Sequence, residues 1–199
     1  TTTIKMISGL YNPTFGKIRI NGFDINKDPI KAKSLIGYIP DQPFIYEKLT
    51  GREFLFFCGG LYSIEKLILK NRIDEIIEKL EIGDWVDKRT EEYSQGMKQR
   101  ITIASALLHD PKLLLVDEPM VGLDPQSALI VKNILTEKAQ NGAAVFMSTH
   151  SLNVAEEICT RIGIIKDGNM IFSDTKEVLE NIKGNDNQNL ESLFLQLTK

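Results

Sequence analysis

The chain has 199 residues, of which 42% are hydrophobic and 26% charged. This length is sufficient to bury a core without disulfides, and the composition is typical of globular proteins, which excludes disorder, collagen-like repeats and a coiled coil. The net charge is −3, and its 24 basic and 27 acidic residues are spread along the chain. Nucleic acid is therefore not an expected partner, because binding to phosphate backbones requires a dense basic face.

The first part of the chain predicts a helix and two strands. Residues 3–10 carry apolar side chains at helical spacing and predict a helix. Residues 18–20 alternate apolar and polar side chains before an Asn-Gly pair, which predicts a short strand and a turn. Residues 35–39 predict another strand, which Pro40 ends.

The pattern between residues 50 and 108 changes to helical spacing without strands. Ile73, Ile76, Ile77 and Leu80 recur at the spacing of one buried helical stripe. We therefore expect a helical insert or subdomain here.

The second half of the chain alternates strands and helices. Residues 113–116 are apolar at every position, as in a parallel strand that is covered on both faces. The alternation predicts an α/β fold with a largely parallel sheet. The remaining predicted elements are helices over 127–139 and 151–159, a strand over 143–147, a hairpin over 162–172, and helices over 175–182 and 190–197.

Two carboxylates follow the buried strand directly, at Asp117 and Glu118. They are expected at the carboxyl edge of the sheet, where ligands of open α/β sheets bind. Asp117 could orient a Mg²⁺ ion near a phosphate, and Glu118 could polarise a water for attack on phosphorus. The alternative is a solvated polar strand end.

A second segment of interest is Tyr93-Ser94-Gln95-Gly96-Met97-Lys98-Gln99-Arg100, which opens a helix. Ser94 and the small Gly96 could present a hydroxyl and backbone N–H groups to an anion at the helix N-terminus. The alternative, and by itself the more common case, is that Ser94 is an ordinary N-cap.

The order of four motifs resembles the ATP-binding cassette (ABC) ATPase family. Residues 93–100 resemble its signature motif, 113–118 its Walker B strand, 122–125 its D-loop, and Ser148-Thr149-His150 the segment that carries its switch histidine. The resemblance covers nearly the whole chain and implies a P-loop NTPase (RecA-like) fold. It implies a core over residues 1–43 and 109–174, a helical subdomain over 44–108, and C-terminal helices over 175–199.

The resemblance also implies roles for these residues. Glu118 would be the catalytic base, and His150 would contact the γ-phosphate of ATP. Ser94, Gln95 and Gly96 would contact a nucleotide held by a second copy of the domain, and Asp124 would lie at the dimer seam. The other histidine, His109, lacks such a context and is expected to act as a cap or face solvent.

The chain starts with Thr1-Thr2-Thr3 and has no initial methionine. These residues resemble the segment that follows the family's Gly-rich phosphate loop and its lysine. Thr1 would then bind Mg²⁺ through its hydroxyl, and Thr2 would touch phosphate. The first strands and the loop would be missing, so we expect this chain alone to bind little or no ATP. The alternative is a polar, capped helix start.

The sequence departs from the family pattern in two places. Gln95 stands where the signature motif usually has glycine, which adds bulk. The family has a lid glutamine that contacts the metal or the water. Asp41 occupies the matching position in this sequence, whereas the glutamine itself stands one residue later, at Gln42. Gln42 is therefore named first for this role, with Asp41 as the alternative.

The resemblance implies an ATP-hydrolysing subunit, with ATP and Mg²⁺ as cofactors, that works as a dimer. It would lie in the cytoplasm against the inner face of the membrane and would energise a separate transmembrane permease. Local text around Asp41-Gln42-Pro43 resembles exporters of the multidrug and ABC-2 type. The alternatives are a soluble ABC ATPase acting on ribosomes or DNA, and a nucleotide-binding regulatory module without turnover.

A group of aromatic residues in the helical insert has two interpretations. In the first, the residues form the core of the helical insert. In the second, part of the group lines a groove for the membrane subunit, together with Phe44 and Tyr46. The group comprises Phe54, Phe56, Phe57 and Tyr62.

Overall fold

The structure is a computed structural model, and it describes residues 1–176, 178 and 194–195. The chain divides into two compact units, Thr1–Ser148 and Thr149–Lys199. The helices expected over 175–199 fall almost entirely on residues outside the described part, and Thr175 itself ends a strand. The expected division into core and helical subdomain stays a prediction.

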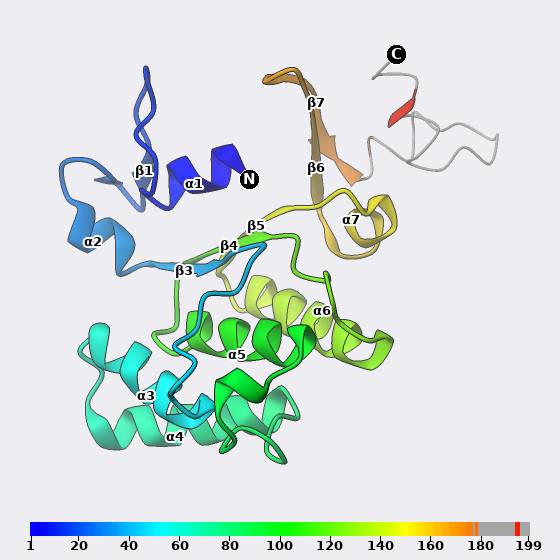
Figure 1. Cartoon of the computed structure of the whole chain (residues 1–199). Helices are drawn as coiled ribbons and strands as arrows, with labels where there is room; N and C mark the ends of the chain where they lie inside the picture. The colour runs from blue at the N-terminus through cyan, green and yellow to red at the C-terminus, as the bar shows by residue number, and fades with distance from the viewer. Residues whose placement is uncertain (177, 179–193, 196–199) are drawn as a thin grey trace. The chain divides into compact units, whose positions relative to one another are not determined.

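A three-stranded parallel sheet lies at the centre of the first unit (Figure 1). Its strands are β3 (Ile36–Ile39), β4 (Leu113–Asp117) and β5 (Ala144–Ser148), in the order β3-β4-β5. The residues of β4 from 114 to 117 are buried, as the continuous apolar run predicted. The predicted α/β class with a parallel sheet is confirmed.

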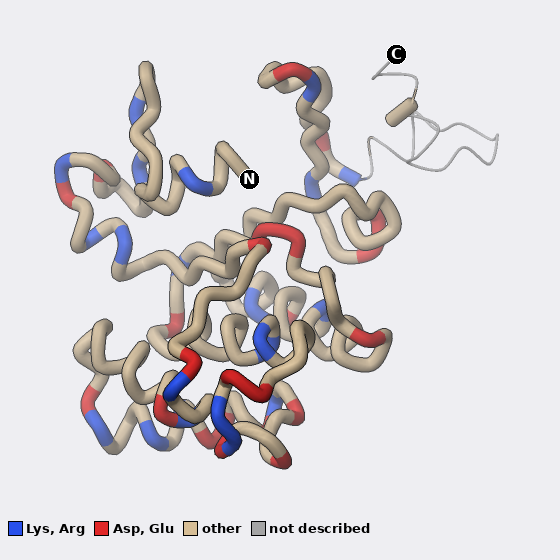
Figure 2. Tube along the Cα trace, viewed as in Figure 1, with Lys and Arg blue, Asp and Glu red and all other residues tan. Residues whose placement is uncertain are grey.

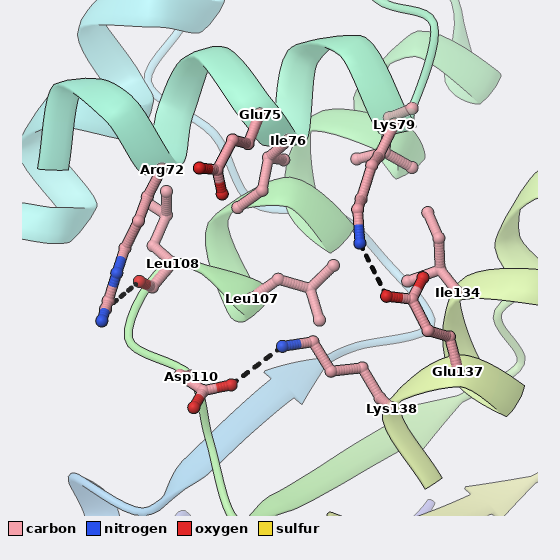
Figure 3. Close-up of a pocket in the computed structure, with 11 residues that line it drawn as sticks. Arg72, Glu75, Ile76, Lys79, Leu107, Leu108, Asp110, Ile134, Glu137 and Lys138 are labelled. Atoms are coloured by element: carbon pink, nitrogen blue, oxygen red, sulfur yellow. Dashed lines mark hydrogen bonds and ion pairs between the residues drawn. The ribbon is translucent and has the colours of Figure 1, made fainter. Parts of the chain in front are cut away.

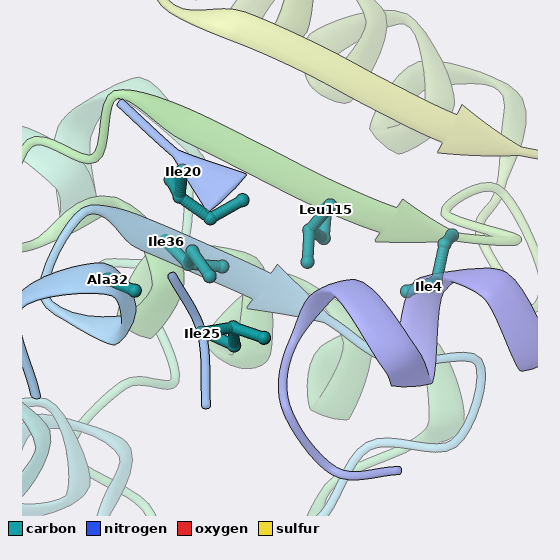
Figure 4. Close-up of a cluster of buried hydrophobic side chains, with 6 residues drawn as sticks. All are labelled: Ile4, Ile20, Ile25, Ala32, Ile36 and Leu115. Carbon is teal, nitrogen blue, oxygen red and sulfur yellow. The ribbon is translucent and has the colours of Figure 1, made fainter. Parts of the chain in front are cut away.

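One face of the sheet is covered by the beginning of the chain (Figure 4). The elements are α1 (Thr2–Ile7), the antiparallel hairpin of β1 (Arg19–Ile20) and β2 (Phe23–Asp24), and α2 (Pro29–Lys33). Their apolar side chains form one buried cluster with two sheet residues, which removes apolar surface from water on this face. The cluster comprises Ile4, Ile20, Ile25, Ala32, Ile36 and Leu115.

Two long helices lie on the other side of the sheet, α5 (Gln95–Leu107) and α6 (Pro125–Gln140) (Figure 1). The helix α5 packs on β3 so closely that a Cβ at Gly37 would lie 2.5 Å from the carbonyl oxygen of Ala106. Only glycine fits at this position of β3, and the close approach brings α5 directly against the sheet.

The insert between β3 and β4 is helical, as predicted. Its elements are α3 (Gly51–Leu61), α4 (Lys66–Lys79), a 3₁₀ turn η1 (Thr90–Glu92) and α5. A reciprocal capping box between Thr50 and Glu53 begins α3. Charges of both signs are interspersed along α4, whereas those of α3 are confined to its first turn, at Arg52 and Glu53 (Figure 2).

The predicted apolar features of the insert are confirmed only in part. Ile73, Ile77 and Leu80 of the predicted stripe are buried. The prediction of an aromatic helical core is wrong for Phe57 and Tyr62, which are 43% and 39% exposed. Phe54 of the same group is buried, as predicted. Phe57 instead contacts the ring of Tyr46, and Tyr62, which directly follows α3, stacks on His109.

The second unit contains α7 (Leu152–Ile158) and an antiparallel hairpin of β6 (Arg161–Lys166) and β7 (Asn169–Thr175). Ile162 is its buried centre, packed by residues of α7 and β7. Among the residues that the structure describes, no helix combines the length and the apolar character that crossing a membrane requires.

Candidate functional site

Polar side chains gather where the parallel strands end. Asp117 is the last residue of β4 and lies opposite Ser148, the last residue of β5. Asp41 and Gln42 follow the end of β3, which lies on the other side of β4. Because parallel strands end at one edge, the topology brings residues from three distant parts of the sequence together, where open α/β sheets bind ligands.

Asp117 is the central group of this edge. It is completely buried, and its Oδ1 accepts hydrogen bonds from the hydroxyl of Thr1, at 3.2 Å, and from the hydroxyl of Ser148. Its other oxygen, Oδ2, is buried and has no hydrogen-bond partner among the described residues. A buried carboxylate oxygen without a partner is unfavourable by itself, so this atom marks a place for a ligand.

The oxygen atoms at this edge fit a Mg²⁺ ion. Mg²⁺ prefers oxygen ligands and is commonly held by one or two carboxylates together with substrate phosphates and water. Thr1, Asp117 and Ser148 supply two hydroxyls and one carboxylate. Within the described part of the chain, no group of three or more His, Cys, Asp or Glu side chains could hold a metal by itself. Water and phosphate oxygens would complete the coordination of an ion held here.

Glu118 leaves the strand in an unusual backbone conformation. Its φ of 50° lies in the left-handed region, which costs a residue with a Cβ about 1 kcal/mol or more. Its backbone N–H donates to the carbonyl oxygen of Ser148, at 3.0 Å. The strained turn redirects the chain directly after Asp117, so the two neighbouring carboxylates do not share one environment: Asp117 is buried and Glu118 is half-buried.

The segment after β3 contains both candidates for the lid position. Gln42 is exposed and Asp41 is half-buried. Burial raises the pKa of Tyr38, and the nearby carboxylates of Asp117 and Asp41 raise it further. Asp41 therefore lies close enough to β3 for its charge to act on the ring of Tyr38.

The signature-like segment forms the N-terminal turn of α5. Ser94 is the N-cap, and its Oγ accepts a hydrogen bond from the N–H of Met97, at 3.2 Å. This confirms the N-cap interpretation without excluding a second partner for an exposed hydroxyl. Gln95 is exposed, and a Cβ at Gly96 would lie 2.8 Å from the carbonyl oxygen of Gly122. Glycine is therefore required at residue 96.

The D-loop-like segment lies against this turn. Gly122 has a φ of 77°, which favours glycine, and a Cβ there would meet the side chain of Gln95 at 2.9 Å. Asp124 is the N-cap of α6 and accepts from both the N–H and the hydroxyl of Ser127. These hydrogen bonds lower the pKa of Asp124, and the charge of Arg100 adds to the effect. Asp124 thus has a structural role that its expected position at a dimer seam did not include.

Three other residues with predicted roles, Thr2, His150 and His109, differ in their exposure and contacts. Thr2 is exposed in the first turn of α1. His150 is exposed and belongs to the second unit. His109, expected as a cap or a solvent-facing residue, instead stacks on Tyr62 with ring centroids 3.7 Å apart and shares a hydrogen bond with the carbonyl oxygen of Ile36, at 3.0 Å. That expectation is wrong because α3 folds back over the turn before β4.

Ser148 is the functional candidate to which sequence reasoning gave no role. The sequence pattern placed it only in the segment that precedes His150, yet its hydroxyl donates a hydrogen bond to the carboxylate of Asp117. Its position as the last residue of a strand that pairs in register with Asp117 is the signal that would have identified it.

A pocket between α4, the end of α5 and α6 is separate from this site (Figure 3). Two of its three acidic residues, Glu137 and Asp110, are paired with Lys79 and Lys138, at 2.7 and 2.9 Å. None of the residues at the sheet edge lines it. The lining residues are Arg72, Glu75, Ile76, Lys79, Leu80, Leu107, Leu108, Asp110, Ile134, Glu137 and Lys138.

The structure is an α/β domain with a parallel sheet, a helical insert and polar groups at the carboxyl edge of the sheet. A solved structure described as the ATP-binding subunit of an ABC transporter matches all of this chain and 82% of its own, with a TM-score of 0.92 and 31% identity. A dimeric ATP-binding cassette in a post-hydrolysis state, bound to ADP and Pi, matches 88% of this chain and 79% of its own at a TM-score of 0.78; its 24% identity shows similarity of fold.

The family profile described as ABC transporter matches residues 1–121. The linearmycin resistance ATP-binding protein LnrL of Bacillus subtilis is 39% identical over 94% of this chain. The uncharacterized ABC transporter ATP-binding protein YxlF of the same species is 37% identical over 98% of it, and ABC transporter A family member 12 of Arabidopsis thaliana is 36% identical over 89%. The chain belongs to the ABC transporter family and has the P-loop NTPase fold of its ATP-binding domains.

The chain is shorter than these relatives. It spans 60% of LnrL, 63% of YxlF and 20% of the plant protein. The predicted family and fold are confirmed, and binding of ATP is the property that the family's ATP-binding domains share.

Proposed function

We propose that this chain is the ATP-binding and ATP-hydrolysing part of a transporter and energises transport through a separate membrane permease. The observation that carries the proposal is the buried Oδ2 of Asp117 at the carboxyl edge of the sheet, which has no hydrogen-bond partner among the residues that the structure describes, while two hydroxyl groups donate to Oδ1. Membership of a family of ATP-binding domains supports ATP as the ligand.

The residues at the edge divide the chemistry between them. A bound Mg²⁺ ion would neutralise charge on the phosphates of ATP. Asp117 would hold the ion through Oδ2, while Thr1 and Ser148 orient the carboxylate through Oδ1. Thr1 would also offer its hydroxyl oxygen to the metal, and the neighbouring Thr2 would touch phosphate.

Glu118 is proposed as the general base. A base must reach the attacking water directly, and Glu118 leaves the strand beside Asp117 with its side chain only half-buried. Its strained φ supports this role, since unusual backbone conformations cluster at active sites. His150 is proposed to contact the γ-phosphate, as the family resemblance implies.

For the lid position Gln42 is proposed first because it keeps the chemical type of the family's glutamine, and Asp41 is the alternative. Gln42 is exposed and Asp41 is half-buried. The charge of Asp41 helps to raise the pKa of Tyr38 on β3, so its carboxylate lies near the sheet edge.

A second copy of the domain is proposed to complete the site. Ser94 and Gln95 are exposed at the N-terminus of α5, where N–H groups and the helix dipole favour an anion. Together with Gly96 they would contact the phosphates of a nucleotide held by the partner copy, and Asp124 would lie at the seam. The dimeric solved relative is consistent with this arrangement.

A permease partner is supported by an exposed aromatic patch formed by Phe44, Tyr46 and Phe57. These side chains are 76%, 47% and 43% exposed, and the ring of Tyr46 contacts the other two edge to face, with centroids 5.7 and 5.3 Å apart. Exposed apolar patches mark sites of protein or membrane contact. The word resistance in the name of LnrL supports an exporter, which would place this domain in the cytoplasm at the membrane.

Hydrolysis of Mg-ATP by the full-length natural protein that contains this chain tests the proposal. The Glu118→Gln variant should reduce the rate by about two orders of magnitude while ATP still binds, because only proton transfer is removed. An unchanged rate in this variant would exclude Glu118 as the base. Co-purification of a membrane-spanning protein tests the permease, and a partner-free soluble ATPase would argue against transport.

A further inference from the structure

The face of α5 that begins at the signature segment also holds the loop that follows Glu118. Residues 96, 99 and 100 of α5 lie on one helical face, because they are spaced at i, i+3 and i+4. Each is linked to a different part of segment 119–124, which connects Glu118 to Asp124.

The first link is a close backbone approach. Gly96 lies close to Gly122. A side chain at residue 96 would collide with the carbonyl oxygen of Gly122, and a side chain at residue 122 would collide with Gln95. The turn of α5 that is proposed to touch nucleotide therefore packs directly on the middle of the segment.

The second link is a buried hydrogen bond. The side chain of Gln99 is 1% exposed, and its Nε2 donates to the carbonyl oxygen of Pro119, at 3.4 Å. Pro119 is the residue directly after Glu118. Within the segment, the backbone N–H of Val121 donates to the carbonyl oxygen of Glu118 and that of Leu123 to Met120, both at 3.3 Å, so the bond from Gln99 adds a link from outside the segment.

The third link is electrostatic and includes the single tryptophan of the chain. The positive charge of Arg100 acts on Asp124 at the far end of the segment. The guanidinium of Arg100 also lies over the ring of Trp85, 5.1 Å from its centroid, and Tyr93 meets that ring edge to face, at 4.9 Å. Trp85 therefore contacts residues on both sides of Ser94 and can report on the position of the signature segment.

We infer that Gln99 is a positioning residue, whose buried amide holds the segment after Glu118 against the signature helix α5 of the same chain. Of the three links, it is the one closest in sequence to Glu118. A displacement of the N-terminal turn of α5 would then reach Glu118 through Gln99 and Pro119. The catalytic consequence rests on the proposed function, whereas the tether itself rests only on these contacts.

The test compares Gln99→Met with Thr102→Val in the full-length protein. Met has a similar length and good helix propensity but cannot donate a hydrogen bond. Thr102 is the matched control, because it is buried on the same helix and its hydroxyl donates within the helix, to Lys98. Gln99→Asn is a second variant, which keeps the amide but is too short to reach Pro119.

The first readout is amide hydrogen exchange without nucleotide. Exchange at Val121 and Leu123 should become roughly tenfold faster in Gln99→Met and Gln99→Asn and stay unchanged in Thr102→Val, because local opening becomes easier without the tether. Unchanged exchange at these amides in both Gln99 variants would overturn the tether. Trp85 fluorescence should stay close to that of the wild type if the fold around the signature segment is intact.

The second readout is the kinetics of Mg-ATP hydrolysis. A positioning role predicts a roughly tenfold lower kcat with KM within twofold, since misplacement by a fraction of an ångström affects the transition state more than binding. Faster exchange with an unchanged kcat would overturn the positioning role. A wild-type protein that does not hydrolyse ATP would refute the proposed function, and the exchange data alone would then decide on the tether.

Discussion

Two places in the first unit gather carboxylates, and they differ in burial. At the edge of the sheet, Asp117 is fully buried, and one of its oxygens has no hydrogen-bond partner in the described part of the chain. In the pocket between α4 and α6, Asp110 and Glu137 are exposed and each is paired with a lysine (Figure 3). A buried polar atom without a partner costs free energy that a ligand can recover, whereas exposed ion pairs are screened by water. The contrast supports the buried edge, and not the pocket, as the proposed site of chemistry.

The largest expected effect separates these two kinds of carboxylate directly. In Asp117→Asn the negative charge that would hold Mg²⁺ is lost, so hydrolysis should fall by at least about a hundredfold, because a metal contributes several kcal/mol to catalysis. The matched control is Asp110→Asn, which removes an exposed carboxylate from the pocket. Magnesium titrations of the ATPase rate measure both variants. A rate in Asp117→Asn within a few-fold of the wild type would refute this site, as would an equal loss in the control.

An intermediate effect concerns His109, beside the pocket residue Asp110. The pKa of His109 is lowered to about 4, mainly by burial, and the positive charges of Arg72 and Lys138 add to the lowering. The hydrogen bond to Ile36 and the charge of Asp110 act in the opposite direction and raise it. The unfolded chain then binds a proton more readily than the folded protein, so stability should fall as the pH drops from about 6.5 to 4. The variant His109→Phe keeps a ring to stack on Tyr62 but cannot titrate.

Urea unfolding at several pH values measures this contribution. The difference in unfolding free energy between the wild type and His109→Phe should change between pH 6.5 and 4 and stay constant above that window. Subtracting the two proteins cancels the titration of carboxylates, which is common to both. Parallel stability profiles would contradict a buried, neutral His109.

The smallest expected effect belongs to the pocket itself. Lys79 and Glu137 are about half-exposed and their charged atoms are 2.7 Å apart, and Lys79 lowers the pKa of Glu137. A double-mutant cycle with Lys79→Met and Glu137→Gln should give a coupling of no more than about 1 kcal/mol, which decreases in high salt. A much larger, salt-independent coupling would show that burial is not what separates the two regions.

Much of the fold could be predicted because its signals are local. The continuous apolar run before Asp117 predicted a covered strand, and the spacing of Ile73, Ile77 and Leu80 predicted the buried side of α4. The order of short motifs identified the family, which the comparisons confirm. These features depend on side-chain periodicity and on residue types at fixed spacing, which a sequence displays directly.

Other features depend on residues that are far apart in the chain. Nothing near His109 indicated that Tyr62 would stack on it, and nothing near Phe57 indicated which side of α3 would stay exposed. The same holds for the contact between Gln99 and Pro119, which are 20 residues apart. Such contacts depend on how helices pack against one another, and the local sequence pattern does not determine this packing.

The sequence by itself determined the class of this protein and the order of most of its elements, and it predicted the pair Asp117-Glu118 as the chemical centre. Only the tertiary structure decided which groups surround that centre. It buried Asp117, gave it the hydroxyls of Thr1 and Ser148 on one oxygen, and left the other oxygen without a partner among the described residues. The reason is that residue type and strand position can be read along the chain, whereas burial and hydrogen-bond partners exist only once parallel strands from distant segments end at one edge.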